Sequence, residues 1–372
     1  MPARSIRHAA APFSRQVNRQ PKRFPKVVAH CLGIALGVCS IAAVSAVELP
    51  RGVYSLSTTG KTANDAVLTN PDVAGVSIRY NWSDLEPSEG AFNWSFLDAE
   101  VARVAAAGKQ VLLRINTQGG KPAWVTTAVQ NKGGKFFTFD DNGVTTAIPV
   151  FWNGTYLKKK KNMIAAVGAH FTNNPAIVAV TASFANATSE DWNVPHTAVD
   201  VVNWFAVGYT TDKLLNAGKQ IIDATMVAFP NQYVLLAIAG NGHVGATGNL
   251  DPTADYVAEN AIATARTTWP GRLSAQINSL STFNPVAPGD DGSIWNLLWN
   301  SRSDVGAQML YWCFEEPTYR VNGGVPGDDA AILTKCVDAA ASYELKYVEI
   351  YQKDVINLPS VISYAKTKLG AN

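Results

Sequence analysis

Eight short apolar segments alternate with segments of helical periodicity along most of the chain, and this alternation constrains its fold most strongly. Several of the segments are apolar almost throughout, as expected for strands buried on both faces of a parallel sheet. The predicted strands are residues 52–57, 74–80, 110–115, 177–183, 233–239, 273–279, 307–313 and 346–351. The sequence therefore predicts repeated β–α units.

The units fit a closed barrel better than an open sheet. An open nucleotide-binding sheet normally carries a glycine-rich turn, GxGxxG, after its first strand, whereas this chain has Ser57-Thr58-Thr59-Gly60 there. A barrel takes about 250 residues or more, so one barrel accounts for nearly all of the 372 residues. We expect an α/β fold, a single (β/α)8 TIM barrel over residues 47–372, with loop insertions at its carboxyl-terminal face.

Residues 1–46 have the composition of an export signal. They contain seven basic residues and no acidic ones, and residues 27–46 are predominantly apolar. Val44-Ser45-Ala46 is a small-residue cleavage site, which predicts a secreted or periplasmic protein. An uncleaved segment of this length could instead anchor the chain in a membrane, the one membrane association that the sequence suggests.

The remaining residues exclude some partners and cofactors. Seven of the 31 basic residues lie in residues 1–46, so residues 47–372 contain 24 basic and 29 acidic residues and carry a net charge of about −5. This segment therefore has no surplus of basic residues for binding nucleic acid. The lysine run 158–161 is expected to be a solvated helix face. Cys313 and Cys336 could form a disulfide or remain two buried thiols. Without a CxxC motif or a Cys/His cluster, a structural zinc site is disfavoured.

One segment after the second predicted strand is rich in aromatic rings and carboxylates, the side chains that bind sugars. It reads Arg79-Tyr80-Asn81-Trp82-Ser83-Asp84-Leu85-Glu86-Pro87-Ser88-Glu89-Gly90-Ala91-Phe92-Asn93-Trp94. An arginine at a strand end followed by W-x-x-L-E-P-x-x-G-x-F/Y-x-W resembles the second βα unit of barrel glycosidases. The similarity is closest to family 42 β-galactosidases and related enzymes of the same retaining clan.

The resemblance implies a general acid/base carboxylate after the fourth strand, and Glu190 is the candidate, with Trp192 as a stacking platform for sugar. The family usually shows Asn-Glu as adjacent residues there, whereas Asn186 and Glu190 are four positions apart. Glu190 and Asp191 could also be ordinary solvated loop acids.

The resemblance also implies a glutamate nucleophile at the seventh strand, which points to Glu315 or Glu316. Glu349 is the preferred candidate, because a carboxylate inside an otherwise apolar eighth strand is costly unless it is paired or functional. The alternative is a structural ion pair between Glu349 and a barrel arginine, Arg79 or Arg114.

Other polar and aromatic residues near strand ends are predicted to bind the substrate: Arg79, Asn81, Trp82, Glu86, Arg114, Asn116, Asn186, Trp192 and Trp312. The prediction is thus a retaining glycoside hydrolase that cleaves an extracytoplasmic carbohydrate with a pair of glutamates. We expect no metal or organic cofactor, because this chemistry needs only the carboxylate pair and hydrogen bonds. Two alternatives stay open: a barrel that binds carbohydrate without cleaving it, and another hydrolase or lyase with the same fold.

Overall fold

The computed structural model describes residues 47–141, 143–184, 192, 194–195, 197–239, 256–289 and 294–370. These residues belong to one compact unit, Ala46–Asn372. Within them, no helix has the length and apolar character needed to cross a membrane.

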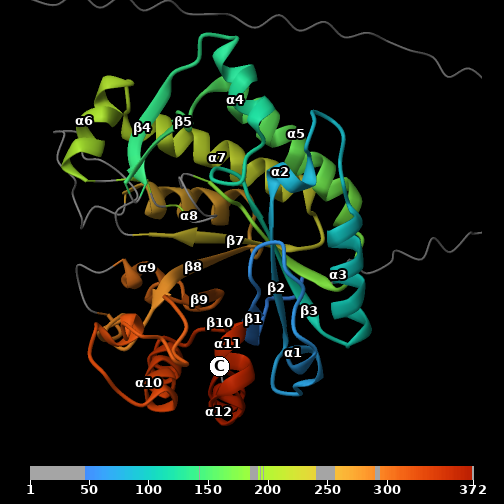
Figure 1. The fold of residues 1–372 in the computed structure, drawn as a ribbon, viewed down its shortest axis with the longest axis vertical. Helices are drawn as coiled ribbons and strands as arrows, with labels where there is room; N and C mark the ends of the chain where they lie inside the picture. Colours follow the sequence, from blue (N-terminus) through green and yellow to red (C-terminus); the bar gives the residue numbers. More distant parts are fainter. Residues whose placement is uncertain are drawn as a thin grey trace, which may run out of the picture. The chain divides into compact units, whose positions relative to one another are not determined.

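Eight parallel strands close into a barrel in the order β1-β10-β9-β8-β7-β6-β3-β2 (Figure 1). They are β1 (Gly52–Leu56), β2 (Gly75–Asn81), β3 (Gln110–Asn116), β6 (Ile177–Thr181), β7 (Tyr233–Ile238), β8 (Leu273–Leu280), β9 (Val305–Met309) and β10 (Tyr347–Tyr351). The predicted (β/α)8 barrel is confirmed, and each predicted strand overlaps an observed one. The seventh strand ends at Met309 rather than at Cys313, so that prediction was too long.

Helices separate the strands and cover the outside of the barrel (Figure 1). They are α1 (Asp65–Thr69), α2 (Trp82–Leu85), α3 (Ser95–Ala106), α4 (Ala123–Gln130), α5 (Gly154–Phe171), α6 (Ala198–Ala206), α7 (Thr211–Ala228), α8 (Tyr256–Thr268), α9 (Trp295–Trp299), α10 (Asp329–Ser342), α11 (Gln352–Asn357) and α12 (Pro359–Gly370). Helix α3 buries Leu97, Val101 and Val104 as its periodicity predicts.

An antiparallel hairpin, β4 (Phe136–Asp141) and β5 (Val144–Pro149), is inserted between α4 and α5. This hairpin was not predicted from the sequence. Helix α6 packs on this hairpin, and the Asn203 side chain donates a hydrogen bond to the Thr138 carbonyl. Trp204 of α6 stacks on Phe137 of β4 with ring centroids 3.5 Å apart. Aromatic packing therefore joins the insertion to α6, and these side chains belong to the main core.

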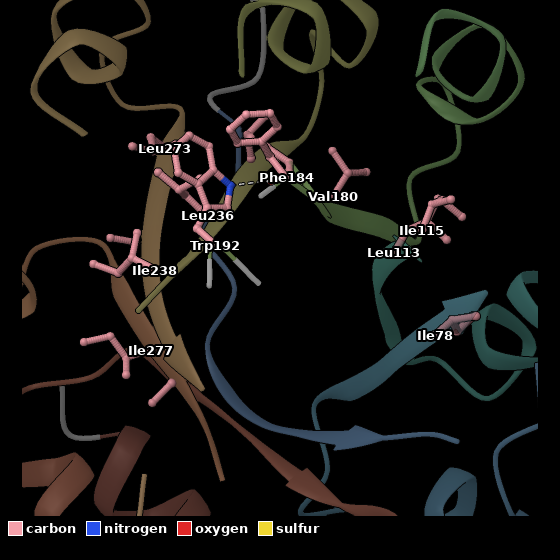
Figure 2. Packing of buried hydrophobic residues seen from close by; sticks show 14 of the residues in the cluster. Ile78, Leu113, Ile115, Val180, Phe184, Trp192, Leu236, Ile238, Leu273 and Ile277 are labelled. Carbon is pink, nitrogen blue, oxygen red and sulfur yellow. Dashed lines mark hydrogen bonds between the residues drawn. The ribbon is translucent and has the colours of Figure 1, made fainter. Parts of the chain in front are cut away.

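The main core fills the space between the barrel and its helices. Figure 2 shows outward-facing aliphatic side chains of β2, β3, β6, β7 and β8 in this layer, together with Phe184 and Trp192. A second, smaller core lies inside the barrel and includes Tyr54, Leu112, Leu235 and Tyr347. The centre of the barrel is therefore packed with side chains, as in other barrels of eight strands.

Two details of the core answer questions that the sequence left open. Cys313 and Cys336 are both buried and unbonded, so the free-thiol alternative holds. Lys160 corrects the expectation of a solvated lysine run, because its side chain is fully buried. Its ammonium donates a hydrogen bond to the Ser183 carbonyl and lies 5.4 Å from the ring centroid of Phe184. Burial lowers the pKa of Lys160 well below its ordinary value.

Candidate active site at the barrel mouth

The carboxyl-terminal ends of the eight strands form the barrel mouth, the end at which barrel enzymes carry their chemistry. Arg79 of β2 and Arg114 of β3 are register partners there, as expected for arginines on adjacent strands. Arg79 and Asn116 are half-buried, whereas Arg114 is 1% exposed. The mouth therefore presents polar side chains above a buried polar layer.

An ion pair between Glu349 and Arg114 forms the centre of this buried layer. Arg114 Nε donates to Glu349 Oε1 at 3.0 Å, and Arg114 Nη2 forms the second contact of the pair. Gln276 Nε2 donates to Glu349 Oε2 at 2.7 Å. The Glu349 side chain is 0% exposed. Glu349 is therefore paired with a barrel arginine, Arg114, on a strand across the barrel interior.

Gln276 is held in one orientation by its other hydrogen bonds. Its Oε1 accepts from the Tyr347 hydroxyl at 2.8 Å, and its Nε2 also donates to Asn278 Oδ1 at 2.6 Å. Because both ends of the amide have partners, the network fixes Glu349 from a second strand. Gln276 was not predicted as a site residue, and its only signal in the sequence is a long polar side chain within a predicted buried strand.

The loop after β9 carries the other two glutamate candidates in different environments. Glu316 is 6% exposed, and its carboxylate accepts hydrogen bonds from the Thr318 hydroxyl at 2.7 Å and the Arg320 N–H at 2.7 Å. Those contacts hold the turn that follows. The Glu315 side chain is 72% exposed and lies 4.0 Å from Lys353 Nζ. Glu315 also has a positive φ of 50°, which non-glycine residues rarely adopt outside functional loops and tight turns.

Trp82 and Glu86 lie in the core, which corrects their predicted role as surfaces for substrate. Trp82 is 0% exposed, and its indole N–H donates to Glu86 Oε2 at 2.7 Å. Glu86 also accepts from the Gly90 N–H, and its carbonyl accepts from the Trp124 indole. The aromatic and acidic motif thus folds the loop onto itself. Asn81 is half-buried and donates to Asp84 Oδ2 at 3.0 Å.

Trp192 is likewise a core residue rather than a stacking platform. It is 3% exposed, packs against Phe184 and donates from its indole N–H to the Ala182 carbonyl at 3.1 Å (Figure 2). Glu190 and Asn186 lie outside the described residues, so their predicted roles stay predictions.

A pocket of about 540 Å³ opens at the mouth between the ends of β1, β2, β9 and β10. Three aromatic rings line it, with Tyr311 and Trp312 stacked 3.8 Å apart and Tyr351 about 6 Å from both. The full lining is Leu56, Ser57, Thr58, Thr59, Arg79, Tyr311, Trp312, Tyr351, Gln352, Lys353, Ile356 and Asn357. Of the predicted binding residues, the structure brings Arg79 and Trp312 together here. Tyr351 and Lys353 were missed, since only the fold shows that β10 ends beside β1.

Asp354 is a further residue that sequence reasoning missed. It is 0% exposed, and its carboxylate accepts hydrogen bonds from the N–H groups of Cys313 and Phe314 at 2.7 to 2.9 Å. Asp354 therefore fixes the loop after β9 against α11. Among the described residues, no group of histidine, cysteine, aspartate or glutamate side chains could hold a metal ion.

Comparison with known families supports the nature of this barrel. Residues 64–218 match the sequence model of glycoside hydrolase family 42, described as β-galactosidase. The resemblance predicted from the motif after the second strand is thus confirmed, and the matched segment includes Glu190.

Solved glycosidase barrels share the fold at low identity. The catalytic domain of β-amylase from Paenibacillus polymyxa superposes with a TM-score of 0.57 at 11% identity, covering 85% of this chain and 98% of that one. The β-galactosidase from Rahnella sp. R3 superposes with a TM-score of 0.51 at 11% identity, covering 86% of this chain and 56% of that one. The β-galactosidase from Marinomonas ef1 superposes with a TM-score of 0.51 at 12% identity, covering 81% of this chain and 54% of that one. This chain thus spans about half the length of those β-galactosidases. A search of curated protein sequences found no match.

Proposed function

We propose that this protein is a retaining glycosidase that binds an extracytoplasmic carbohydrate in the pocket at the barrel mouth. The observation that carries the proposal is the pocket itself, which combines three aromatic rings with hydroxyl, amide and cationic side chains. Aromatic faces stack on the apolar faces of sugar rings, while the polar groups take the hydroxyls. The match of residues 64–218 to the model of glycoside hydrolase family 42 supports the same reaction class.

The proposed catalytic pair consists of Glu190 as acid/base and a second glutamate as nucleophile. Retention needs two carboxyl groups about 5 Å apart, one to protonate the leaving oxygen and one to attack the anomeric carbon. Glu315 is the favoured second member, because it is exposed beside Lys353, a pocket residue. Glu349 fits the role less well, since neither of its oxygens is exposed and both already accept hydrogen bonds.

Substitution of the four glutamates tests the assignment. Hydrolysis of aryl glycosides and polysaccharides would be assayed for wild type and for Glu190→Gln, Glu315→Gln, Glu316→Gln and Glu349→Gln. The nucleophile variant should lose activity on every substrate, whereas the acid/base variant should retain some on substrates with activated leaving groups. Glu259→Gln, at an exposed position of α8, is the matched control. Full activity of Glu190→Gln on all substrates would refute the acid/base role.

A second candidate function is carbohydrate binding without cleavage, and one observation favours it. Strand β9 carries no acidic residue, and Gln308 lies on it as the register partner of Glu349. The strand that supplies the nucleophile in the resembling family therefore offers an amide in the barrel. Binding of an oligosaccharide by a wild-type protein that cleaves none of the substrates would support this alternative.

A further inference from the structure

The pocket at the barrel mouth has an uneven charge. Two of the described residues that line it, Arg79 and Lys353, are cationic, and none is acidic. We propose that the pocket binds a sugar that carries an anionic group, either a carboxylate or a sulfate ester. This inference rests on the proposed carbohydrate function and specifies its substrate class.

The two cations come from different walls of the pocket. Arg79 is on β2, and Lys353 is in the first turn of α11, directly after β10. Lys353 Nζ lies 5.8 Å from the ring centroid of Trp312, so an anion bound by the ammonium would lie close to the aromatic platform. A sugar ring on that platform could therefore direct an acidic substituent at Lys353.

Among the described residues, the nearby carboxylates do not cancel the positive charge of Lys353. Glu315 lies 4.0 Å from Lys353 Nζ, but its side chain is 72% exposed, so water and salt screen the pair. Glu349 is held by Arg114 and Gln276, and Asp354 is held by the N–H groups of Cys313 and Phe314. The buried acids thus already have donors of their own.

Hydrogen-bond donors in the pocket strengthen the case for an anion. The indole nitrogen of Trp312 is buried and has no hydrogen-bond partner among the described residues. The hydroxyls of Thr58 and Thr59 line the same pocket. A carboxylate or sulfate has acceptors only, so a site rich in donors suits it better than it suits a neutral hydroxyl.

Binding measurements can test the inference without any assumption about cleavage. The quenching of tryptophan fluorescence would be titrated with D-glucuronic acid, glucose 6-sulfate and D-glucose, using wild type, Lys353→Gln and Lys335→Gln. Lys335 is exposed on α10 and does not line the pocket, so its variant is the control. A charge-assisted hydrogen bond should make at least one anionic sugar bind about tenfold more tightly than glucose. Lys353→Gln should remove most of that preference, and salt should weaken only the anionic ligands.

The two anionic probes separate a carboxylate site from a sulfate site. Equal or tighter binding of glucose, or no binding of any probe, would overturn the inference, as would an unchanged preference in Lys353→Gln. The glycosidase proposal fails independently. If the protein binds glucuronate but cleaves no glycoside, the anionic-sugar inference holds and the glycosidase proposal is wrong. If it cleaves glycosides but shows no preference for anionic sugars, the glycosidase proposal holds and the anionic-sugar inference is wrong.

Discussion

Asp354 controls the loop after β9 through a single buried carboxylate. Its oxygens accept hydrogen bonds from the N–H groups of Cys313 and Phe314, which directly precede Glu315 in the chain. Burial raises the pKa of Asp354 to about 6, although those N–H donors oppose the shift. The loop that carries the favoured nucleophile candidate is therefore anchored by a group that titrates near neutral pH.

This shift predicts a pH dependence of stability. Because the folded pKa lies above the ordinary value of 3.8, the stabilisation from Asp354 is complete below about pH 4 and is lost as the pH rises through about 6. The difference corresponds to about 3 kcal/mol. Asp354→Asn should remove it, so the stability of the variant relative to wild type should rise between pH 4 and pH 7 in urea unfolding. The free energy of unfolding of the control Glu259→Gln should depend on pH as that of wild type does. If the free energy of unfolding of Asp354→Asn shows the same pH dependence as that of wild type, the prediction is contradicted.

The Arg114–Glu349 pair predicts a large cost for breaking it on one side. Glu349→Gln removes the negative charge that pairs with the buried guanidinium of Arg114, so the free energy of unfolding should fall by about 3 to 5 kcal/mol. Lys366→Gln, which breaks the exposed contact with Asp72, should cost less than about 1 kcal/mol. Denaturant unfolding measures both. A Glu349→Gln variant of unchanged stability that has lost all activity would instead favour a catalytic role.

At the scale of elements, two glycines let strands of the barrel pack around tyrosines. A Cβ on Gly306 of β9 would lie 2.2 Å from the ring of Tyr347, its register partner on β10, and one on Gly75 would lie 2.5 Å from Tyr54. Gly306→Ala should therefore lower stability by about 1 to 3 kcal/mol through overpacking. Gly154→Ala, at the first residue of α5 with open space around it, should be neutral or stabilising by about 0.5 kcal/mol. Thermal unfolding of the two variants tests this difference. The prediction is wrong if the melting temperatures of both variants shift by the same amount from that of wild type.

The strands were predictable because their apolar runs are local, whereas the hairpin was missed despite a local signal. Asp140, Asp141 and Gly143 mark the turn between β4 and β5, where Gly143 has a φ of 85°. The early end of β9 was not predictable in the same way. Tyr311 and Trp312, after Met309, continue the apolar pattern of a strand but line the pocket instead, which only tertiary structure reveals.

The candidate site was predictable only in part, because side chains with the right chemistry also serve the core. Trp82, Trp192 and Trp312 are all tryptophans at or near the ends of predicted strands, yet only Trp312 lines the pocket, and the other two are buried in the core. Glu349 was conspicuous as an acid in an apolar strand, but its pairing with Arg114 joins residues 235 positions apart. Such long-range pairs follow from strand order and register, which no local pattern contains.

At the scale of the whole molecule, the residues before β1 contribute to the interior of the barrel. Val47 and Leu49 pack, partly buried, against the inner core that contains Tyr54 and Tyr347. We propose that export ends with cleavage after Ala46, so that N-terminal sequencing of the mature protein begins at Val47. Such a cut keeps both side chains with the barrel that they cover.

This placement predicts a sharp limit for shortening the chain. A chain that begins at Val47 should unfold like the mature protein, whereas one that begins at Arg51 loses Val47 and Leu49 and should be less stable by about 1 to 3 kcal/mol, because two half-buried aliphatic side chains no longer cover the core. Glu48→Gln in the longer chain is the control, since Glu48 is exposed between them. Urea unfolding at constant pH measures the difference. Equal stability of the two chains would show that the barrel core needs no cover before β1, and a mature protein that begins well before Val47 would refute the cleavage site.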